Sequence, residues 1–235
     1  MQRAAHFIAN WQYMKNDRTF RLEGYYKDYQ HLIREPYTRY VPNRFRNISD
    51  TATLWNNGYG YAQGMELFWR DKKSIKNADY WISYSYIDTR RLYEQLIYEA
   101  TPTFIATHNL NLVGKYFVTK WNTSISATYT YSSGYPYYNP EAMANAGNFL
   151  SDRTPAFNNV ALQAAYLHTF GRWFSVFFIS IDNVLNTKNV FGYRYSFDAS
   201  GNVIPGSKRA VVPSLYRTIF VGANFSLSQF KKDEI

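Results

Sequence analysis

Eight segments of the chain alternate apolar and polar residues, and this periodicity is the strongest constraint on its fold. A ninth, 173–182, is apolar on both faces until Ser180, so its orientation stays open. The clearest segment, Trp121 to Ser132, places Trp, Thr, Ile, Ala and Tyr on one side and only Asn, Ser and Thr on the other. Successive side chains of a β-strand point to opposite faces, so the pattern predicts strands with one apolar face each. The predicted strands span 6–14, 19–33, 58–70, 80–86, 108–117, 121–132, 160–170, 173–182 and 217–227.

The connections between these strands are alternately short and long along the whole chain. Bacterial outer-membrane barrels have short periplasmic turns and longer extracellular loops. The sequence therefore predicts an all-β fold, an antiparallel transmembrane β-barrel segment that begins outside the cell and ends in the periplasm. Complete single-chain barrels have an even number of strands and begin in the periplasm. Nine strands with an external start predict a fragment of a larger barrel.

The composition favours a membrane barrel over the other fold classes. The chain has 23 Tyr, 17 Phe and 6 Trp, yet its mean hydropathy is -0.44. A helical membrane protein needs runs of about twenty apolar residues, which this chain lacks. In a barrel, alternation averages to a hydrophilic value while aromatic girdles raise the aromatic content. We therefore expect outer-membrane lipid as a partner and the cell outer membrane as the location.

A soluble β-sandwich or a lipocalin-like barrel is the competing architecture, because both also show alternation. Their outward faces should be polar and carry Lys and Glu. Here one face is aliphatic and aromatic, and the other carries Ser, Thr and Asn with scattered charge. A lipid-facing Lys or Arg near mid-bilayer would cost about 2–4 kcal/mol, and the predicted outward faces carry none.

Charge and residue usage argue against several function classes. The formal net charge is +9, but the basic residues are scattered, so we expect no nucleic-acid partner. The absence of Cys excludes disulfides, thiolate metal sites and Cys nucleophiles. The four His are dispersed, so we expect no metal or cofactor. An outer-membrane enzyme such as a phospholipase is a weaker alternative, since no Gly-x-Ser-x-Gly is present, and we assign no catalytic residue.

Five segments resemble the C-terminal barrel of TonB-dependent receptors, the 22-stranded plugged transporters of outer membranes. The most specific pieces are Asn-Val-Leu-Asn and Asn-Val-Phe-Gly-Tyr, and the resemblance covers nearly the whole chain. One departure is that members commonly end near an aromatic residue, whereas Phe225 is followed by further residues and a charged tail. The segments are Gly58 to Lys72, Tyr80 to Tyr86, Pro102 to Leu110, Tyr129 to Pro140 and Asp182 to Tyr195.

The resemblance implies that residues 1–235 are the C-terminal portion of such a barrel, without the N-terminal plug domain and signal peptide. It further implies import powered by TonB and ExbB/ExbD, with the plug domain and a small nutrient ligand as partners. That nutrient would be an iron chelate, cobalamin or a saccharide. The alternative is a self-contained smaller barrel or a passive porin closed by oligomerisation.

Two groups of residues are candidates for function. The first should face the barrel lumen, where it contacts the plug, lines a solute path or is simply hydrated. The second should lie in an extracellular loop, where it stacks on a ligand or anchors the chain in the membrane interface. The lumen-facing candidates are Arg21, Glu23, Lys27, Glu66, Arg70 and Lys115, and the aromatic loop candidates are Tyr135, Tyr137 and Tyr138.

Overall fold

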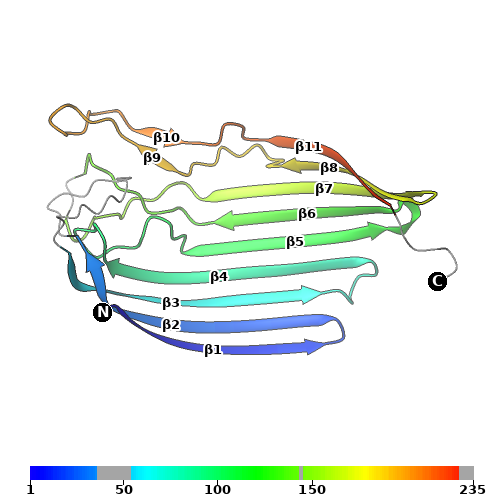
Figure 1. Cartoon of the computed structure of the whole chain (residues 1–235), viewed down its shortest axis with the longest axis horizontal. Coiled ribbons are helices and arrows are strands. Elements are labelled where there is room, and N and C mark those ends of the chain that lie inside the picture. The colour runs from blue at the N-terminus through cyan, green and yellow to red at the C-terminus, as the bar shows by residue number, and fades with distance from the viewer. Residues whose placement is uncertain (36–53, 143–144, 228–235) are drawn as a thin grey trace.

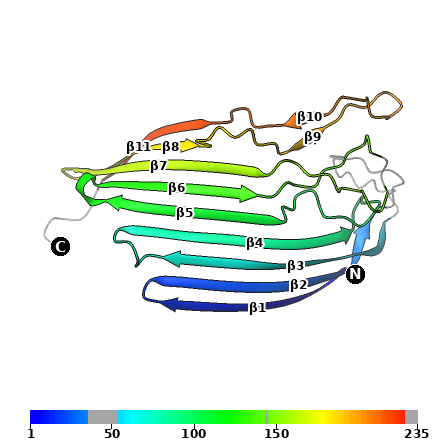
Figure 2. The same cartoon turned by 180° about the vertical axis from the view of Figure 1, so that it is seen from behind.

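The computed structural model describes residues 1–35, 54–142 and 145–227. Nine strands form one antiparallel sheet in which sequence neighbours are also sheet neighbours, in the order β1-β2-β3-β4-β5-β6-β7-β8-β11 (Figures 1 and 2). The predicted all-β class and antiparallel nine-stranded arrangement are confirmed. These strands are β1 (Arg3–Lys15), β2 (Arg18–Arg34), β3 (Trp55–Asp71), β4 (Ala78–Leu92), β5 (His108–Val118), β6 (Thr123–Ser132), β7 (Phe157–Phe170), β8 (Trp173–Asp182) and β11 (Thr218–Leu227).

The two ends of the sheet differ in their connections. Four short turns gather at one end, here called the turn end, and the long connections gather at the other, the loop end (Figure 1). The chain begins at the loop end, and β11 finishes at the turn end. Most of the predicted connection from Arg34 to Asn57 lies outside the described residues.

The strand register gives the sheet an apolar face and a polar face. Central strands keep large apolar side chains on the apolar face, where Met65, Ile125 and Ile179 are 42%, 41% and 43% exposed. Such an exposed apolar surface fits a lipid environment better than water. The apolar face carries Phe7, Leu22, Met65, Ile82, Leu112, Ile125, Leu162, Ile179 and Val221; the polar face carries Gln12, Glu23, Glu66, Ser83, Asn111, Thr130, Gln163, Ser180 and Asn224.

The orientation of β8, which its sequence left uncertain, follows from its register. Phe177 and Ile179 share the apolar face with Val221 of β11. Phe178 lies on the polar face, where its ring covers Gly222. A Cβ at Gly222 would lie 2.5 Å from that ring, so a larger residue here would displace the Phe178 side chain.

Strands β2 to β4 continue beyond the apolar band at the loop end. The 17 residues of β3 span roughly 55 Å at about 3.3 Å per residue, about twice the thickness of an apolar barrel band. On this extension, the face that is apolar elsewhere in the sheet carries polar side chains. Asp88 there accepts hydrogen bonds from Tyr61 at 3.1 Å and from Gln63 at 3.0 Å. The change of polarity marks where the strands leave the apolar band.

The structure clarifies two local features of the sequence. The sequence of residues 91–98 allows a helical turn, but the structure forms none there: β4 continues to Leu92, and Arg91 lies side by side with Ala100 and exchanges backbone hydrogen bonds with it at 2.9 and 3.1 Å. Trp121 belongs to a 3-10 turn, Thr119–Trp121, so β6 begins two residues later than predicted. No helix within the described residues is long and apolar enough to cross a membrane.

The small residues of β3 leave room for large side chains of the same sheet. A Cβ at Gly64 would lie 2.5 Å from the Tyr25 hydroxyl, and one at Gly60 would lie 2.8 Å from Arg91. The Arg91 guanidinium in turn lies 4.5 Å from the centre of the Tyr29 ring. The space beside the small residues of β3 is therefore filled by side chains on the polar face of the same sheet.

Candidate ligand-binding site

A second, smaller sheet lies at the loop end and was missed by the sequence analysis. It pairs β9 (Gly192–Arg194) with β10 (Arg209–Val211) inside the last long connection. Residues 198–202, which are rich in the residue types that form turns, close this hairpin, with the Asp198 carboxylate accepting the backbone N–H of Asn202 at 2.8 Å. Strands of three residues carry too little periodicity to be found in a sequence.

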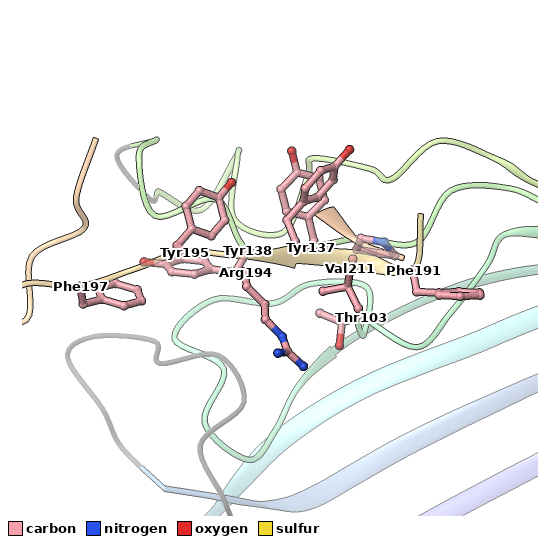
Figure 3. Close-up of a pocket in the computed structure, with 11 residues that line it drawn as sticks. Thr103, Tyr137, Tyr138, Phe191, Arg194, Tyr195, Phe197 and Val211 are labelled. Atoms are coloured by element: carbon pink, nitrogen blue, oxygen red, sulfur yellow. The ribbon is translucent and has the colours of Figure 1, made fainter. Parts of the chain in front are cut away.

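This hairpin and the 133–156 loop enclose a cavity of about 570 Å³. Its wall is largely aromatic, with the rings of Tyr137 and Tyr195 on the upper side and Arg194 extending toward Thr103 (Figure 3). A volume of this size fits a small molecule, for which mostly apolar walls with a few polar groups are usual. The side chains lining the cavity include Thr103, Pro136, Tyr137, Tyr138, Phe191, Tyr193, Arg194, Tyr195, Phe197 and Val211.

Two of the lining tyrosines, Tyr137 and Tyr193, form a cluster with Lys208, which is not itself among the lining residues. The two tyrosine rings lie 4.6 Å apart. The Lys208 ammonium lies 4.2 Å from the centre of the Tyr193 ring and donates a 2.7 Å hydrogen bond to the Tyr137 hydroxyl. Two aromatic faces beside a fixed cation can bind a ligand that is flat or rich in C–H groups and carries negative charge.

The protonation states in this cluster follow from its contacts. Its hydrogen bond to the Tyr137 hydroxyl raises the pKa of Lys208, so the ammonium stays charged at neutral pH. Burial raises the pKa of the nearby Tyr195 phenol, so that group stays neutral. The cavity wall therefore carries the neutral hydroxyl of Tyr195, and the positive charge of Lys208 lies beside the lining tyrosines.

The tyrosine loop is fixed by hydrogen bonds within itself and to the hairpin. The backbone N–H of Tyr137 donates to the Asp152 carbonyl at 2.9 Å, and the Asn139 amide donates to the Asp152 carboxylate at 2.7 Å. Across the cavity, the Tyr195 hydroxyl donates to Asn139 at 3.3 Å. The cavity wall is thus held in place before any ligand arrives, which lowers the entropy lost on binding.

The three predicted loop tyrosines have different surroundings. Tyr137 and Tyr138 line the cavity, and Tyr138 also contacts the ring of Phe149 at 6.1 Å. Tyr135 is not among the cavity residues; its backbone N–H bonds the Thr154 hydroxyl at 2.9 Å. The sequence analysis missed Lys208 and Tyr193. Both lie in the hairpin, 56 or more positions after Tyr137 in the chain. No local signal pairs them with Tyr137.

All six charged candidates lie on the polar face of the sheet. Arg70 pairs with Asp79 at 2.8 Å, and both Arg70 and Lys115 lie over the ring of Trp81 at 5.5 and 5.2 Å. Asp79 and Trp81 were not among the predicted site residues. That this face lines a lumen stays a prediction.

The remaining four strand candidates make aromatic or like-charge contacts. Arg21 lies 5.8 Å from the ring of Phe68, and Lys27 lies 5.2 Å from the ring of Tyr25. Glu23 of β2 stands directly opposite Glu66 of β3. Facing carboxylates repel one another, so this pair favours a cationic or hydrated surrounding.

The Asn-Val-Leu-Asn motif has a structural role at the start of the last long connection. Asn183 is 4% exposed. Its amide donates to the carbonyls of Thr187 and Tyr216 at 2.9 and 2.6 Å and accepts the Thr187 N–H at 2.9 Å. These bonds join the end of β8 to the start of β11, so the motif positions the hairpin that carries half of the cavity.

Replacing Asn183 by Ala should lower the unfolding free energy by about 1–3 kcal/mol, because three hydrogen bonds are lost and buried carbonyls stay unsatisfied. Asn186→Ala is the matched control. Asn186 has the same left-handed backbone, φ 54° against 51° for Asn183, but it is exposed. Urea unfolding in detergent measures both variants, and equal losses would assign the effect to backbone strain alone.

The histidines show no sign of a metal site within the described part of the chain. Tyr84 and His108 share a 2.8 Å hydrogen bond, and Tyr166 and His168 share one of 3.0 Å. Among the residues that the structure describes, no group of three or more His, Asp or Glu is placed to hold a metal ion. These contacts make His108 and His168 part of aromatic clusters on the apolar face.

Comparisons with known proteins support the fold. No family model and no curated protein sequence matches this chain. Among solved structures, it is similar to the ferric citrate transporter FecA, with a TM-score of 0.62, 15% identity and coverage of 95% of this chain and 31% of FecA. It is also similar to the FrpB iron transporter from Neisseria meningitidis, with a TM-score of 0.63, 13% identity and coverage of 94% and 31%.

The ferric yersiniabactin uptake receptor FyuA from Yersinia pestis gives a TM-score of 0.64 at 12% identity, with coverage of 97% of this chain and 30% of FyuA. The chain thus spans about a third of the length of these structures. At such low identity the likeness shows the fold alone. The protein therefore has a nine-stranded antiparallel sheet with the fold of the barrels in these structures.

Proposed function

We propose that residues 1–235 are the C-terminal portion of the barrel of a TonB-dependent outer-membrane transporter, and that the chain binds and imports a scarce nutrient rather than catalysing a reaction. The observation that carries the proposal is the nine-stranded sheet with one exposed apolar face, which superposes on transporter barrels at 94–97% coverage of this chain. A plug domain and the first strands of the barrel would then come from an additional part of the receptor.

The cavity at the loop end is the proposed contact for the nutrient. Its aromatic rings and the Lys208 ammonium suit a compact, negatively charged or hydroxyl-rich molecule, such as an iron chelate or a saccharide. The structures that resemble the chain are named as transporters and receptors for iron complexes, which favours the chelate. The charged polar face would line the lumen, where it contacts the plug or water.

Single cysteines test the proposed membrane topology, because the chain has no Cys of its own. Ser200 lies at the exposed hairpin tip and Lys76 in the exposed turn between β3 and β4. In cells that make the receptor, Ser200→Cys should react with a maleimide carried on a polymer too large for porins. Lys76→Cys should react only after the outer membrane is disrupted.

Labelling of both positions on intact cells, or of Lys76→Cys alone, would contradict this topology. The cysteine-free parent reports the background. Reading the DNA upstream of Met1 tests the domain assignment separately: a continuous frame encoding a signal peptide and a plug domain is the expected result, and an immediate stop codon would favour a self-contained smaller barrel.

A further inference from the structure

The short turns at the turn end carry an excess of positive charge. Turns 15–18, 71–77, 119–122 and 171–172 hold seven basic residues and two acidic ones, a net charge of +5. Not every connection is basic, since the 93–107 loop at the opposite end holds Glu94 and Glu99 and no Lys or Arg. The basic residues of the turns are Lys15, Arg18, Lys72, Lys73, Lys76, Lys120 and Arg172.

One of the two acidic residues is neutralised by Arg18 of the neighbouring turn and by hydrogen bonds within its own turn. Asp71 is 2% exposed, and its carboxylate accepts hydrogen bonds from Arg18 at 3.0 Å, from the Ser74 hydroxyl at 2.6 Å and from the Lys73 backbone N–H at 2.7 Å. Within the described residues, the other basic side chains of the turns form no ion pair. We call them the basic rim: Lys15, Lys72, Lys73, Lys76, Lys120 and Arg172.

Exposed apolar side chains lie beside these cations. Trp121 next to Lys120 is 61% exposed, Phe170 and Trp173 on either side of the Gly171-Arg172 turn are 52% and 49% exposed, and Ile75 next to Lys76 is 53% exposed. Aromatic side chains of membrane proteins gather at the level of the lipid headgroups, and neighbouring Lys and Arg reach into that layer. In a sheet that crosses a membrane, this arrangement would place the basic rim at the height of the phosphates of the nearest leaflet.

We propose that the basic rim binds the phosphate headgroups of anionic phospholipids in the leaflet at the turn end. This inference rests on the proposed function, because it requires the sheet to cross a membrane. The cations come from every short turn between β1 and β8, spread across the width of the sheet. A lipid monolayer presents phosphates along such a line, whereas a folded protein partner would favour a compact patch. The aromatic side chains between the cations, like the line of cations itself, are typical of a surface that contacts lipid.

Tryptophan fluorescence supplies a local probe of this leaflet. Four of the six Trp lie near the turn end on the apolar face or in the turns. The full chain is inserted into phosphatidylcholine vesicles that contain a minor fraction of phosphatidylglycerol, with bromine on the acyl chains of one lipid or the other. Preferential quenching by brominated phosphatidylglycerol measures the selectivity of the rim. The four Trp are Trp11, Trp69, Trp121 and Trp173.

The expected result is stronger quenching by brominated phosphatidylglycerol in the native chain, and a loss of that preference in the double variant Lys73→Glu/Lys76→Glu by a factor of roughly five or more. Lys188→Glu/Arg209→Glu is the matched control: it makes the same change of net charge in exposed residues of the last long connection. This control should retain the preference.

Equal quenching of the native chain by the two brominated lipids would overturn the inference and leave a protein as the partner of the rim. An equal loss of preference in both double variants would overturn it as well, since net charge alone would then explain the selectivity. Absence of quenching by either lipid would show instead that the sheet does not cross the membrane. That outcome contradicts the proposed function and, with it, the lipid site.

Discussion

Replacing Leu112 by Arg should prevent stable insertion of the sheet into lipid. Leu112 lies in the middle of β5 on the apolar face, opposite Ile82 of β4 and Tyr129 of β6. A guanidinium at this height has no water and no counter-ion, so we expect a loss of about 2–4 kcal/mol in the free energy of the inserted state. Because total stabilities of folded domains are about 5–15 kcal/mol, a loss of this size is a large fraction of the whole.

The adjacent residue supplies the control. Val113 lies on the polar face, opposite Trp81 of β4 and Thr128 of β6, so Val113→Arg introduces the same group one position away on the other side of the sheet. Its guanidinium can lie over the Trp81 ring, as Arg70 and Lys115 do at 5.5 and 5.2 Å. Urea titration of vesicle-inserted protein, followed by heat-modifiable gel mobility, compares the two. Equal stabilities would contradict the assignment of the apolar face to lipid.

The fold was predictable because it depends on a short-range signal repeated many times. Each strand of the main sheet is long enough for an alternation of period two to be visible. The connections, alternately short and long, then predict that strands adjacent in the sequence are also adjacent in the sheet. Where that signal weakens, the sequence is less informative. β8 is apolar on both sides, and only its register with Val221 of β11 fixes its orientation. β4 runs on to Leu92 because backbone pairing with β3 continues, although its side chains have turned polar.

The candidate site was predictable only in part because it depends on contacts between distant segments. The aromatic loop is visible in the sequence, so Tyr137 and Tyr138 could be chosen. Lys208 has no feature that distinguishes it from the other basic residues of the loops. It enters the site because β9 and β10 pair and bring its ammonium within 2.7 Å of the Tyr137 hydroxyl. A contact of this kind between distant segments cannot be predicted from the local sequence around either residue.

Gly134 is the point at which the shape of the tyrosine loop can be broken selectively. A Cβ at this position would lie 1.8 Å from the carbonyl oxygen of Thr154, far inside any allowed contact. Gly134→Ala must therefore separate residues 133–136 from residues 152–154. That movement breaks the 2.9 Å hydrogen bonds from Thr154 N–H to the Tyr135 carbonyl and from Tyr137 N–H to the Asp152 carbonyl. We expect the cavity wall to be lost while the main sheet persists.

Trypsin provides the measurement, because Arg153 is the only Lys or Arg between residues 133 and 156. Cleavage after Arg153 should accelerate at least about tenfold in Gly134→Ala, the factor given by ~1.4 kcal/mol of local destabilisation when opening is fast relative to cleavage. Gly147→Ala is the control in the same loop, since its nearest neighbour would be a side-chain oxygen at 3.3 Å. Its cleavage rate should stay at the native value. Equal cleavage rates of Gly134→Ala and Gly147→Ala would contradict the close packing of residues 133–136 on residues 152–154. They would also contradict the conclusion that the cavity wall is formed before a ligand binds.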